Sequence, residues 1–284
     1  MIITVASGKG GTGKTLVTAS LAHVWGGPLT AVDLDVEEPN LHLFLRPELV
    51  DALPALMEVP VVDEDACTGC RACSDLCQFK AITVFGDVAM TFPEMCHGCG
   101  GCLAVCPVEA LSPGSRELGE ITTGTFGAQR FAMGRLRVGE AMSPPLMRQV
   151  KALVARWAKT EGRDTLVDGP PGVSCPAVTA VGGSDVVVLV ADSTPFGMHD
   201  FQLALEAFAP MHIPTGVVVN NVGLGDNSCQ ALCRERGLPV WAEIPFSRTI
   251  AEHYSRGDVV AEAMPEFRPV FERLRDSILE AAHA

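Results

Sequence analysis

The chain has 284 residues, 48% of them hydrophobic and 19% charged, which supports a buried core and excludes a disordered protein. Acidic residues outnumber basic ones by 34 to 21, and the net charge of −13 argues against direct binding to nucleic acid or anionic lipid. The opening residues, MIITVASGKGG, lack the basic and apolar segments of a signal peptide, and no apolar run reaches the ~18 residues of a membrane span. We therefore expect a cytoplasmic protein without a stable membrane anchor, whose eleven cysteines bind metal rather than form disulfides.

A glycine-rich loop is the first motif along the chain. It has the sequence GKGGTGKT, follows a predicted strand over 2–6 and opens a predicted helix over 14–25. The pattern G-x4-GK-[ST] brings backbone N–H groups together at a helix N-terminus, where they bind phosphate. Lys14 is expected to reach the β- and γ-phosphates, and the Thr15 hydroxyl to hold Mg²⁺. The predicted phosphate-binding residues are Gly8, Lys9, Gly10, Gly11, Thr12, Gly13, Lys14 and Thr15.

A block of cysteines follows. Eight of the eleven form two runs of C-x2-C-x2-C-x3-C, and the second run repeats the first 29 residues later (67 to 96). Three thiolates at this spacing bind one [4Fe–4S] cube, and the fourth cysteine of each run ligates the other cube. The alternative is a pair of zinc sites, which the duplicated fourth cysteines disfavour. We assign Cys67, Cys70, Cys73 and Cys106 to cluster one, and Cys96, Cys99, Cys102 and Cys77 to cluster two.

The cysteine block resembles the bacterial two-cluster ferredoxin over residues 61–111. Pro107 follows the last cysteine as that pattern requires, whereas Gln78 stands where the first run would have a proline. We therefore expect a small α+β ferredoxin-like domain at 61–111. It would be inserted into a discontinuous domain formed by residues 1–60 and 112–284.

Short apolar runs and helical stretches alternate in the rest of the chain. Four such runs are TLVDGPPG, DVVVLVADSTP, TGVVVNN and PVWAEIP. Helical spacing occurs between them over 198–210 and 227–237, and residues 117–138 alternate like a hairpin before a helix near 145–160. This alternation predicts an α/β domain with a mostly parallel sheet and helices on both faces.

The lysine at position 9 makes the phosphate loop similar to the deviant Walker A loop of the MinD superfamily. This is the MinD/ParA/Mrp/nitrogenase-iron-protein class of P-loop ATPases, and the resemblance covers about residues 1–45 and 160–255. It implies dimerisation on ATP binding, either as a homodimer or with a related ATPase. In the dimer, Lys9 would reach the nucleotide of the partner subunit.

The resemblance also implies a catalytic set and a magnesium set. Asp35, in the sequence VDLD, would orient the attacking water and act with Lys14 and Lys9. Asp33 would act through the hydration shell of Mg²⁺. Asp168, in LVDGPPG, would do the same just before switch II at 169–172.

Two further residues of the nucleotide site are implied by the resemblance. Asn220, which ends the run TGVVVNN, would bind adenine with its amide, and Asn221 is the alternative. Pro245 would lie in the loop that closes over the base.

Three cysteines lie outside the block. Cys175 follows Asp168 by seven residues, an offset that leaves open a cluster bridging two subunits, although a small buried residue is favoured. Cys229 and Cys233 are four residues apart on a predicted helix and could share a ligand. The favoured expectation is one buried and one incidental cysteine.

The last helix carries an apolar stripe formed by Val270, Leu274, Ile278 and Ala281. Its charges are balanced, whereas a helix on a membrane surface is rich in cations. We therefore expect this helix to pack on the sheet.

The leading functional hypothesis is an iron–sulfur protein that binds and hydrolyses ATP with Mg²⁺. Nucleotide-driven dimerisation and switch motion would gate electron transfer through two [4Fe–4S] clusters to a redox partner. One alternative is an ATPase that carries or assembles iron–sulfur or other metal clusters for a partner protein. Another is a MinD-like spatial-positioning switch with a redox-sensing ferredoxin module.

Overall fold

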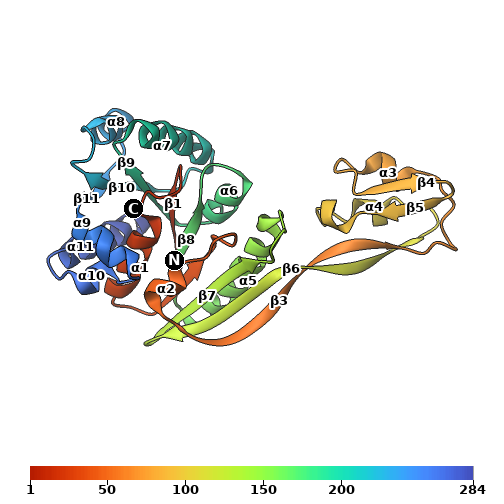
Figure 1. The fold of residues 1–284 in the computed structure, drawn as a ribbon, viewed down its shortest axis with the longest axis horizontal. Coiled ribbons are helices and arrows are strands. Elements are labelled where there is room, and N and C mark those ends of the chain that lie inside the picture. The colour runs from red at the N-terminus through yellow and green to blue at the C-terminus, as the bar shows by residue number, and fades with distance from the viewer. Residues whose placement is uncertain (284) are drawn as a thin grey trace. The chain divides into compact units, whose positions relative to one another are not determined.

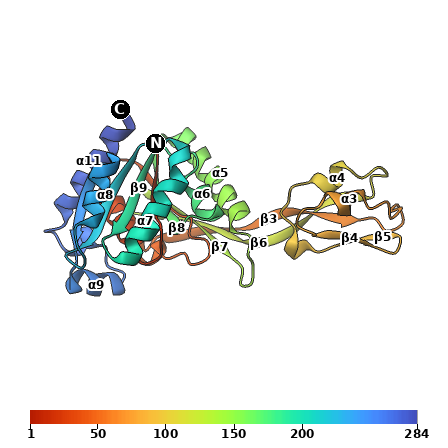
Figure 2. The ribbon, with the colours of Figure 1, turned by 90° about the horizontal axis from the view of Figure 1, so that it is seen from above.

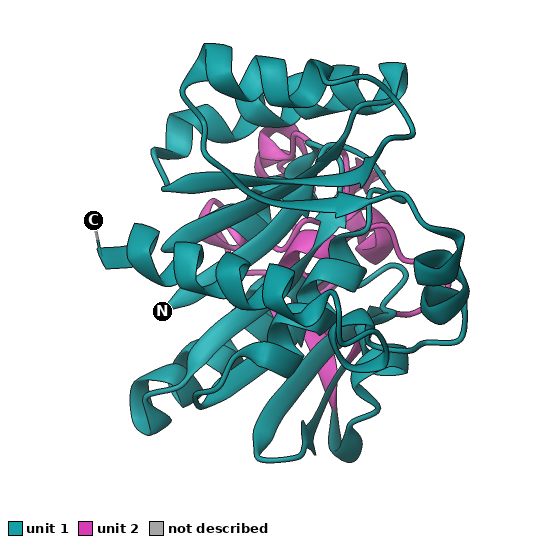
Figure 3. Cartoon of the chain, turned by 90° about the vertical axis from the view of Figure 1, so that its left-hand side faces the viewer, with its two compact units in different colours: residues 1–52, 121–135, 147–284 teal, residues 53–120, 136–146 magenta. Residues whose placement is uncertain are grey.

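The computed structural model describes residues 1–283 and has an α/β fold (Figure 1). Contacts divide the chain into two units (Figure 3). The first unit comprises residues 1–52, 121–135 and 147–284, and the second comprises residues 53–120 and 136–146. The predicted insertion at 61–111 falls within the second unit.

Most strands are short runs rich in valine and other residues whose branched side chains pack well on a pleated surface. Two longer strands, β3 and β6, contribute residues to both units. The strands are β1 Ile2–Ser7, β2 Leu29–Asp33, β3 Glu48–Val62, β4 Ile82–Phe85, β5 Val88–Thr91, β6 Leu111–Phe126, β7 Gln129–Leu136, β8 Asp164–Pro171, β9 Val186–Asp192, β10 Thr215–Val222 and β11 Val240–Pro245.

The helices begin and end at residues suited to those positions. Thr194 caps α7 by accepting the N–H of Gly197 at 3.1 Å, and Gly237 ends α8 in the left-handed conformation. The helices are α1 Lys14–Val24, α2 Leu41–Leu45, α3 Ala72–Leu76, α4 Gly101–Ala104, α5 Ser143–Glu161, α6 Cys175–Val181, α7 Pro195–Phe208, α8 Ser228–Arg236, α9 Arg248–Ser255, α10 Val260–Ala263 and α11 Arg268–His283, with short 3-10 turns η1 Pro93–Met95 and η2 Ala209–Met211.

One large sheet has the strand order β11-β10-β9-β1-β8-β2-β7-β6-β3. Every neighbouring pair from β11 to β7 is parallel, which confirms the predicted mostly parallel sheet. A two-residue turn at 127–128 joins β6 to β7, so this pair is antiparallel and forms the hairpin expected from residues 117–138.

The register of the parallel strands brings polar residues to one edge of the sheet. Asp33 lies opposite Asp168, and Asp192 lies opposite Asn220. These four residues lie toward the carboxyl ends of their strands, the edge where open α/β sheets bind ligands.

Apolar side chains cover both faces of this sheet (Figure 2). On one face, α1, α10 and α11 enclose a core that includes Val17 and Leu21. On the other, α6, α7 and α8 enclose a core that includes Phe201 and Leu232. The helices on both faces are those expected from the alternating sequence pattern.

The C-terminal helix α11 belongs to the first of these cores. Phe271, Leu274 and Ile278 are fully buried, and Val270 is partly buried beside them. This confirms that the apolar stripe packs within the protein. None of the helices within residues 1–283 is long and apolar enough to cross a membrane.

The second unit has a small core. β4 and β5 form an antiparallel ladder, and α3 packs against α4. Cys73, Ile82, Val84, Ala89 and Leu111 are buried together. Four more cysteines pack partly buried against this group, so the cysteines contribute a large part of the core; they are Cys67, Cys77, Cys102 and Cys106.

The sequence repeat of the second unit is also a repeat of backbone conformation. Positions 29 residues apart take the same positive φ: 63° and 64° at Gly69 and Gly98, and 70° and 69° at Arg71 and Gly100. Lys80 and Glu109 follow the rule with 55° and 53°. Left-handed backbone is uncommon outside glycine, so this agreement shows that both halves fold around the same turns.

Candidate functional site

The glycine-rich loop at 8–15 connects β1 to α1. Gly13 has φ of 97°, and a Cβ added there would collide with the side-chain amide of Asn220. Only glycine fits this position. Gly10 and Gly11 are exposed, and an added Cβ at either would meet no atom within 4 Å, so the outer part of the loop is open to a ligand.

Lys14 is buried beneath this loop. Its Nζ donates to the Ser7 hydroxyl at 3.0 Å, and that hydroxyl donates to the carbonyl oxygen of Lys9 at 2.6 Å. Burial lowers the pKa of Lys14, although the carboxylates of Asp168 and Asp35 oppose this shift. The ammonium is therefore held in place near carboxylates but lacks a direct anionic partner at hydrogen-bond distance among the described contacts.

Thr15 and Thr18 surround the carboxylate of Asp168. The Oγ1 of Thr15 lies 2.7 Å from Asp168 Oδ2, and the Oγ1 of Thr18 lies 3.0 Å from Asp168 Oδ1. The Thr15 hydroxyl is also 2.9 Å from Oδ1 of Asn40. Hydroxyl, carboxylate and amide oxygens are the ligands and water-shell partners that Mg²⁺ prefers, and here they meet beside the phosphate loop.

Asp33 shapes the loop that follows β2. Its Oδ1 accepts the N–H of Asp35 at 3.0 Å, and its Oδ2 accepts the N–H groups of Asn40 and Leu41 at 2.8 and 2.9 Å. Burial, together with the nearby charge of Asp168, raises the pKa of Asp33 well above its usual value. In this structure the carboxylate binds the backbone of its own loop.

Asp35 is half-buried on the same loop. Burial raises its pKa from 3.8 to about 6, and Asp168 adds to this effect while Lys14 opposes it. A carboxylate near Lys14 with such a pKa can accept a hydrogen bond from water.

Lys9 has partners within its own chain. Its Nζ lies 3.2 Å from Asp192 Oδ2 and 3.2 Å from the Thr194 hydroxyl. The side chain of Lys9 is 25% exposed and that of Asp192 is 6% exposed. Reaching a partner's nucleotide would therefore require Lys9 to exchange these contacts for new ones.

Asn220 lies directly beneath the phosphate loop. Its Nδ2 donates to the carbonyl oxygen of Thr12 at 2.7 Å, and the side chain is buried. Pro245 ends β11 and pairs in register with Val222, two residues after Asn220. Pro245 is exposed, and Asn221 has a positive φ of 56°.

Several residues at this site were missed from the sequence. Thr18 could have been found, because it lies one helical turn after Lys14, and Asp192 ends a parallel strand as the other acidic residues do. Asn40 precedes the run LHLFL in an N-cap position. Tyr254, which hydrogen bonds to Thr15, lies on α9 and carries no local signal of this contact.

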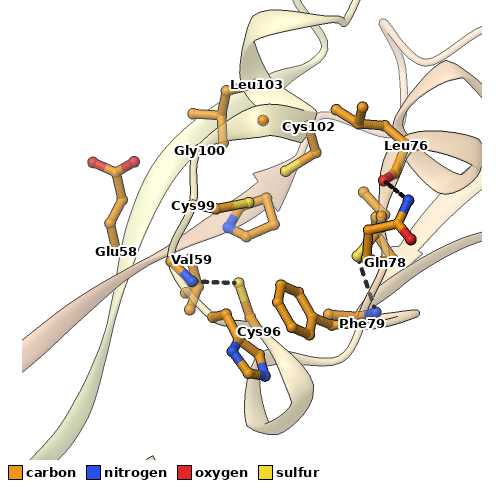
Figure 4. Close-up of a pocket in the computed structure, with 17 residues that line it drawn as sticks. Glu58, Val59, Leu76, Gln78, Phe79, Cys96, Cys99, Gly100, Cys102 and Leu103 are labelled. Atoms are coloured by element: carbon orange, nitrogen blue, oxygen red, sulfur yellow. Dashed lines mark hydrogen bonds between the residues drawn. The ribbon is translucent and has the colours of Figure 1, made fainter. Parts of the chain in front are cut away.

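The second unit contains a cavity of about 270 Å³ lined by four cysteines. Three of them, Cys96, Cys99 and Cys102, come from the second run, and Cys77 comes from the first. Figure 4 shows the sulfur atoms of Cys96, Cys99 and Cys102 facing this space. The remaining wall is mainly apolar, with Leu103 among its residues.

A second, tighter cavity of about 10 Å³ lies among the other four cysteines. Cys67, Cys70 and Cys73 come from the first run, and Cys106 comes from the second. Each cavity therefore combines three cysteines of one run with the fourth cysteine of the other run, which is the combination predicted for each cluster.

Backbone N–H groups already point at four of these sulfur atoms. Ala81 donates to Cys77 and Ala110 donates to Cys106, both at 3.3 Å and both four residues further along the chain. The N–H groups of Ala89 and Gly98 point at Cys67 and Cys96, both at 3.4 Å. Hydrogen bonds of this kind stabilise a thiolate.

The described residues 1–283 contain no group of three or more His, Cys, Asp and Glu side chains placed to hold one metal ion. A tetrahedral zinc site requires its ligands to converge on a single point. In a [4Fe–4S] cube each thiolate binds a different iron, so the sulfur atoms stand further apart. The arrangement therefore favours a cluster over a zinc ion.

The three cysteines outside the block differ from the expectations. Cys175 is exposed rather than buried, because it begins α6 directly after the N-cap Ser174. Cys229 and Cys233 are both fully buried, whereas one was expected to be incidental. They are hydrogen bonded to each other across one turn of α8, which together with burial raises the pKa of Cys229.

The chain matches the family model described as the CobQ/CobB/MinD/ParA nucleotide binding domain over residues 3–260. It is also similar to two uncharacterized proteins of Methanocaldococcus jannaschii. One is 28% identical over 284 residues, which cover 98% of each chain. The other is 26% identical over 262 residues, covering 91% of this chain and 90% of the relative.

Solved structures with a similar fold include two archaeal proteins. The septum site-determining protein MinD of Pyrococcus horikoshii, complexed with Mg-ADP, is 20% identical with a TM-score of 0.61, covering 98% of this chain and 95% of that one. The cell division ATPase MinD of Pyrococcus furiosus is 22% identical with a TM-score of 0.61, covering 98% of each chain. At these identities the likeness shows a shared fold.

Proposed function

The chain belongs to the CobQ/CobB/MinD/ParA nucleotide-binding family, and from that premise we propose that it is a Mg²⁺-dependent ATPase. The observation that carries this proposal is the meeting of Lys14, Thr15 and Asp168 beside an open phosphate loop. The similar fold of the Pyrococcus horikoshii protein, solved with Mg-ADP, supports the same conclusion.

The residues of the loop divide the work of phosphoryl transfer. The N–H groups of the loop and the Lys14 ammonium bind the phosphates and neutralise negative charge in the transition state. Thr15 and Asp168 would hold Mg²⁺ directly or through water, and that ion supplies further charge neutralisation between the phosphates. Asp35 orients the attacking water by accepting a hydrogen bond from it.

Base binding and dimerisation complete the proposal. Asn220 and the Pro245 loop would contact adenine, with Asn220 also fixing the loop through Thr12. Lys9 would leave Asp192 and bind the nucleotide of a second subunit when ATP joins two subunits. The second subunit is either another copy of this chain or a related ATPase.

We further propose that the second unit binds two [4Fe–4S] clusters. The fit rests on two sets of four thiols, on N–H groups directed at sulfur, and on a backbone repeat that gives both sets similar turns. The larger cavity has room for a ligand as it stands, whereas the tighter one must widen. When bound, such clusters supply one-electron transfer.

The combined function that these features support best is ATP-gated electron transfer to a redox partner. β3, β6 and α5 are continuous with both units, so changes at the nucleotide site have a covalent route to the cysteine unit. A metal-cluster carrier remains an alternative because Cys175 is exposed. The fold similarity to the cell division ATPase MinD keeps the positioning switch as a second candidate.

Anaerobic purification followed by iron and sulfide analysis tests the cluster proposal. Two cubes require about eight irons per chain, and two zinc ions with no sulfide would overturn the proposal. Redox titration followed by EPR, with and without ATP and Mg²⁺, then tests gating. Identical potentials, transfer rates and partner affinity in both states would rule gating out.

A further experiment separates the alternatives. A carrier should transfer iron to an apo-acceptor after ATP addition while about eight irons stay on the chain. A positioning switch should show a patterned fluorescent fusion in cells, and an electron-transfer ATPase a diffuse one.

A further inference from the structure

Tyr254, the only tyrosine of the chain, lies at the edge of the phosphate site. It is part of α9, and its hydroxyl hydrogen bonds to the side chain of Thr15. Its ring contacts the ring of Phe44, with centroids 4.8 Å apart and planes inclined by 35°. One side chain therefore contacts both the threonine that begins α1 and the helix α2 that follows the Asp33–Asp35 loop.

The end of α9 and α2 fit closely at this contact. Gly257 has φ of 72°, and a Cβ added there would lie 2.9 Å from the carbonyl oxygen of Leu43. Asp258 lies 3.8 Å from Arg46 at the end of α2. This close fit fixes the backbone at the end of α9 against α2, so the ring contact of Tyr254 is one part of a built interface.

The contacts close into a ring around the Thr15 hydroxyl. Thr15 Oγ1 lies 2.9 Å from Asn40 Oδ1, and Asn40 leads into α2, where Phe44 contacts Tyr254. Tyr254 then returns to Thr15. A threonine hydroxyl carries one proton, which the nearby carboxylate of Asp168 accepts, so the Tyr254 hydroxyl is available to donate to the Thr15 oxygen.

We propose that Tyr254 is a positioning residue of the Mg²⁺–nucleotide site. Its hydroxyl fixes the rotation of the Thr15 side chain, and its ring couples that side chain to α2 and hence to the loop that carries Asp35. The proposal rests on the proposed function of the phosphate loop and extends it to α9. It concerns how Thr15 is presented to Mg²⁺, while no bond from Tyr254 to the metal or to the nucleotide is part of it.

Two substitutions separate the roles of the hydroxyl and of the ring. Tyr254→Phe removes the hydroxyl and keeps the ring contact, and we expect ADP binding to weaken roughly fivefold with Mg²⁺ present and much less in EDTA. Phe44→Leu keeps the hydroxyl and removes the ring partner. Thr215→Val is a matched control, because it removes a hydroxyl that donates to Ile213 on the same sheet without touching the site.

Calorimetric titration of the full chain with ADP, across Mg²⁺ concentrations, measures these effects. Because the chain has one tyrosine, ¹³Cζ-tyrosine labelling gives a single NMR resonance that reports on this hydroxyl. We expect the resonance to shift when Mg²⁺ is added to the ADP complex, and to shift less in Phe44→Leu.

The outcomes separate this proposal from the proposed function. Wild-type protein that binds no nucleotide overturns both. Wild-type protein that binds Mg-ADP, together with a Tyr254→Phe variant of identical Mg²⁺ dependence and an unmoved tyrosine resonance, overturns the positioning role alone. Equal weakening in Thr215→Val also overturns it, because the effect would then be a general loss of stability.

Discussion

Asp33 and Asp35 stand two residues apart after β2 and have different surroundings. Asp33 is fully buried, and its two oxygens accept three backbone N–H groups, so it holds the loop in shape. Asp35 is half-buried and lies within the electrostatic influence of Lys14. At the scale of the residue, the same side chain thus shapes a loop at one position and is available to water at the other.

Asp35→Asn should separate stability from turnover. Burial raises the pKa of Asp35 from 3.8 to about 6 in the metal-free protein. Between about pH 4 and pH 6 the unfolded chain loses this proton before the folded chain does, so wild type becomes less stable relative to the variant. Above pH 6 the difference stays constant, while ATP turnover of the variant falls by roughly 10²-fold or more.

Urea unfolding in EDTA at several pH values, with ATP turnover measured separately, checks this prediction. A stability difference that does not change with pH would contradict the raised pKa. Turnover equal to wild type would remove Asp35 from the catalytic set.

Gly13→Ala should abolish nucleotide binding while the chain still folds. The added Cβ meets the Asn220 amide, and φ of 97° is strained for any other residue, so the loop must move away from its phosphate-binding conformation. Gly27→Ala is the control, because a Cβ there meets nothing within 4 Å and no positive φ is involved. We expect at least tenfold weaker ADP binding for Gly13→Ala alone, on the order of the 1–3 kcal/mol stored in such backbone strain. Equal binding by both variants would contradict it.

At the scale of the element, the repeated turns explain how a small unit can offer two similar sites. α3 and α4 start at equivalent positions, 72 and 101, each directly after a residue in the left-handed conformation. The fourth cysteine of each run lies beyond its helix and lines the cavity of the other run. The two sites therefore depend on each other for one ligand.

Cys77→Ala should damage the site formed by the second run and leave the other site loaded. The reason is that Cys77 lines the cavity of Cys96, Cys99 and Cys102. Iron analysis and EPR of the reduced protein measure the loss, with Cys175→Ala as a control outside the block. Loss of the signal from the first-run site, with the second-run site intact, would reverse the assignment.

Lys80→Gly should stabilise the second unit. Lys80 has φ of 55°, a conformation that costs a residue with a Cβ roughly 1 kcal/mol and costs glycine little. Lys80→Ala removes the same charge and keeps the Cβ, so it is the matched control. Thermal unfolding should show a higher midpoint for the glycine variant than for the alanine variant, and equal midpoints would mean that the turn is not strained.

At the scale of the whole molecule, local patterns predicted the fold and distant contacts escaped prediction. The phosphate loop, the parallel strands and the hairpin each carry their signal within a few residues. Tyr254 and Asp192 meet the loop only because the sheet and the helices on it bring distant segments together. The burial of Cys229 and the exposure of Cys175 likewise depend on how α8 and α6 pack, which spacing alone does not encode.

Lys9→Ala should abolish ATP-dependent dimerisation without removing iron from the second unit. In the single chain the Lys9 ammonium is held by Asp192 and Thr194, so its loss leaves a buried carboxylate with one partner fewer but leaves the phosphate loop intact. If Lys9 serves a second subunit, the variant will bind ATP as a monomer and show no ATP-dependent change in cluster reduction rate. Lys159→Ala, which removes an exposed lysine on α5, is the control for charge. Light scattering and stopped-flow reduction, each with ATP and Mg²⁺, measure the two effects. A variant that dimerises like wild type would place Lys9 in the structure of its own chain alone.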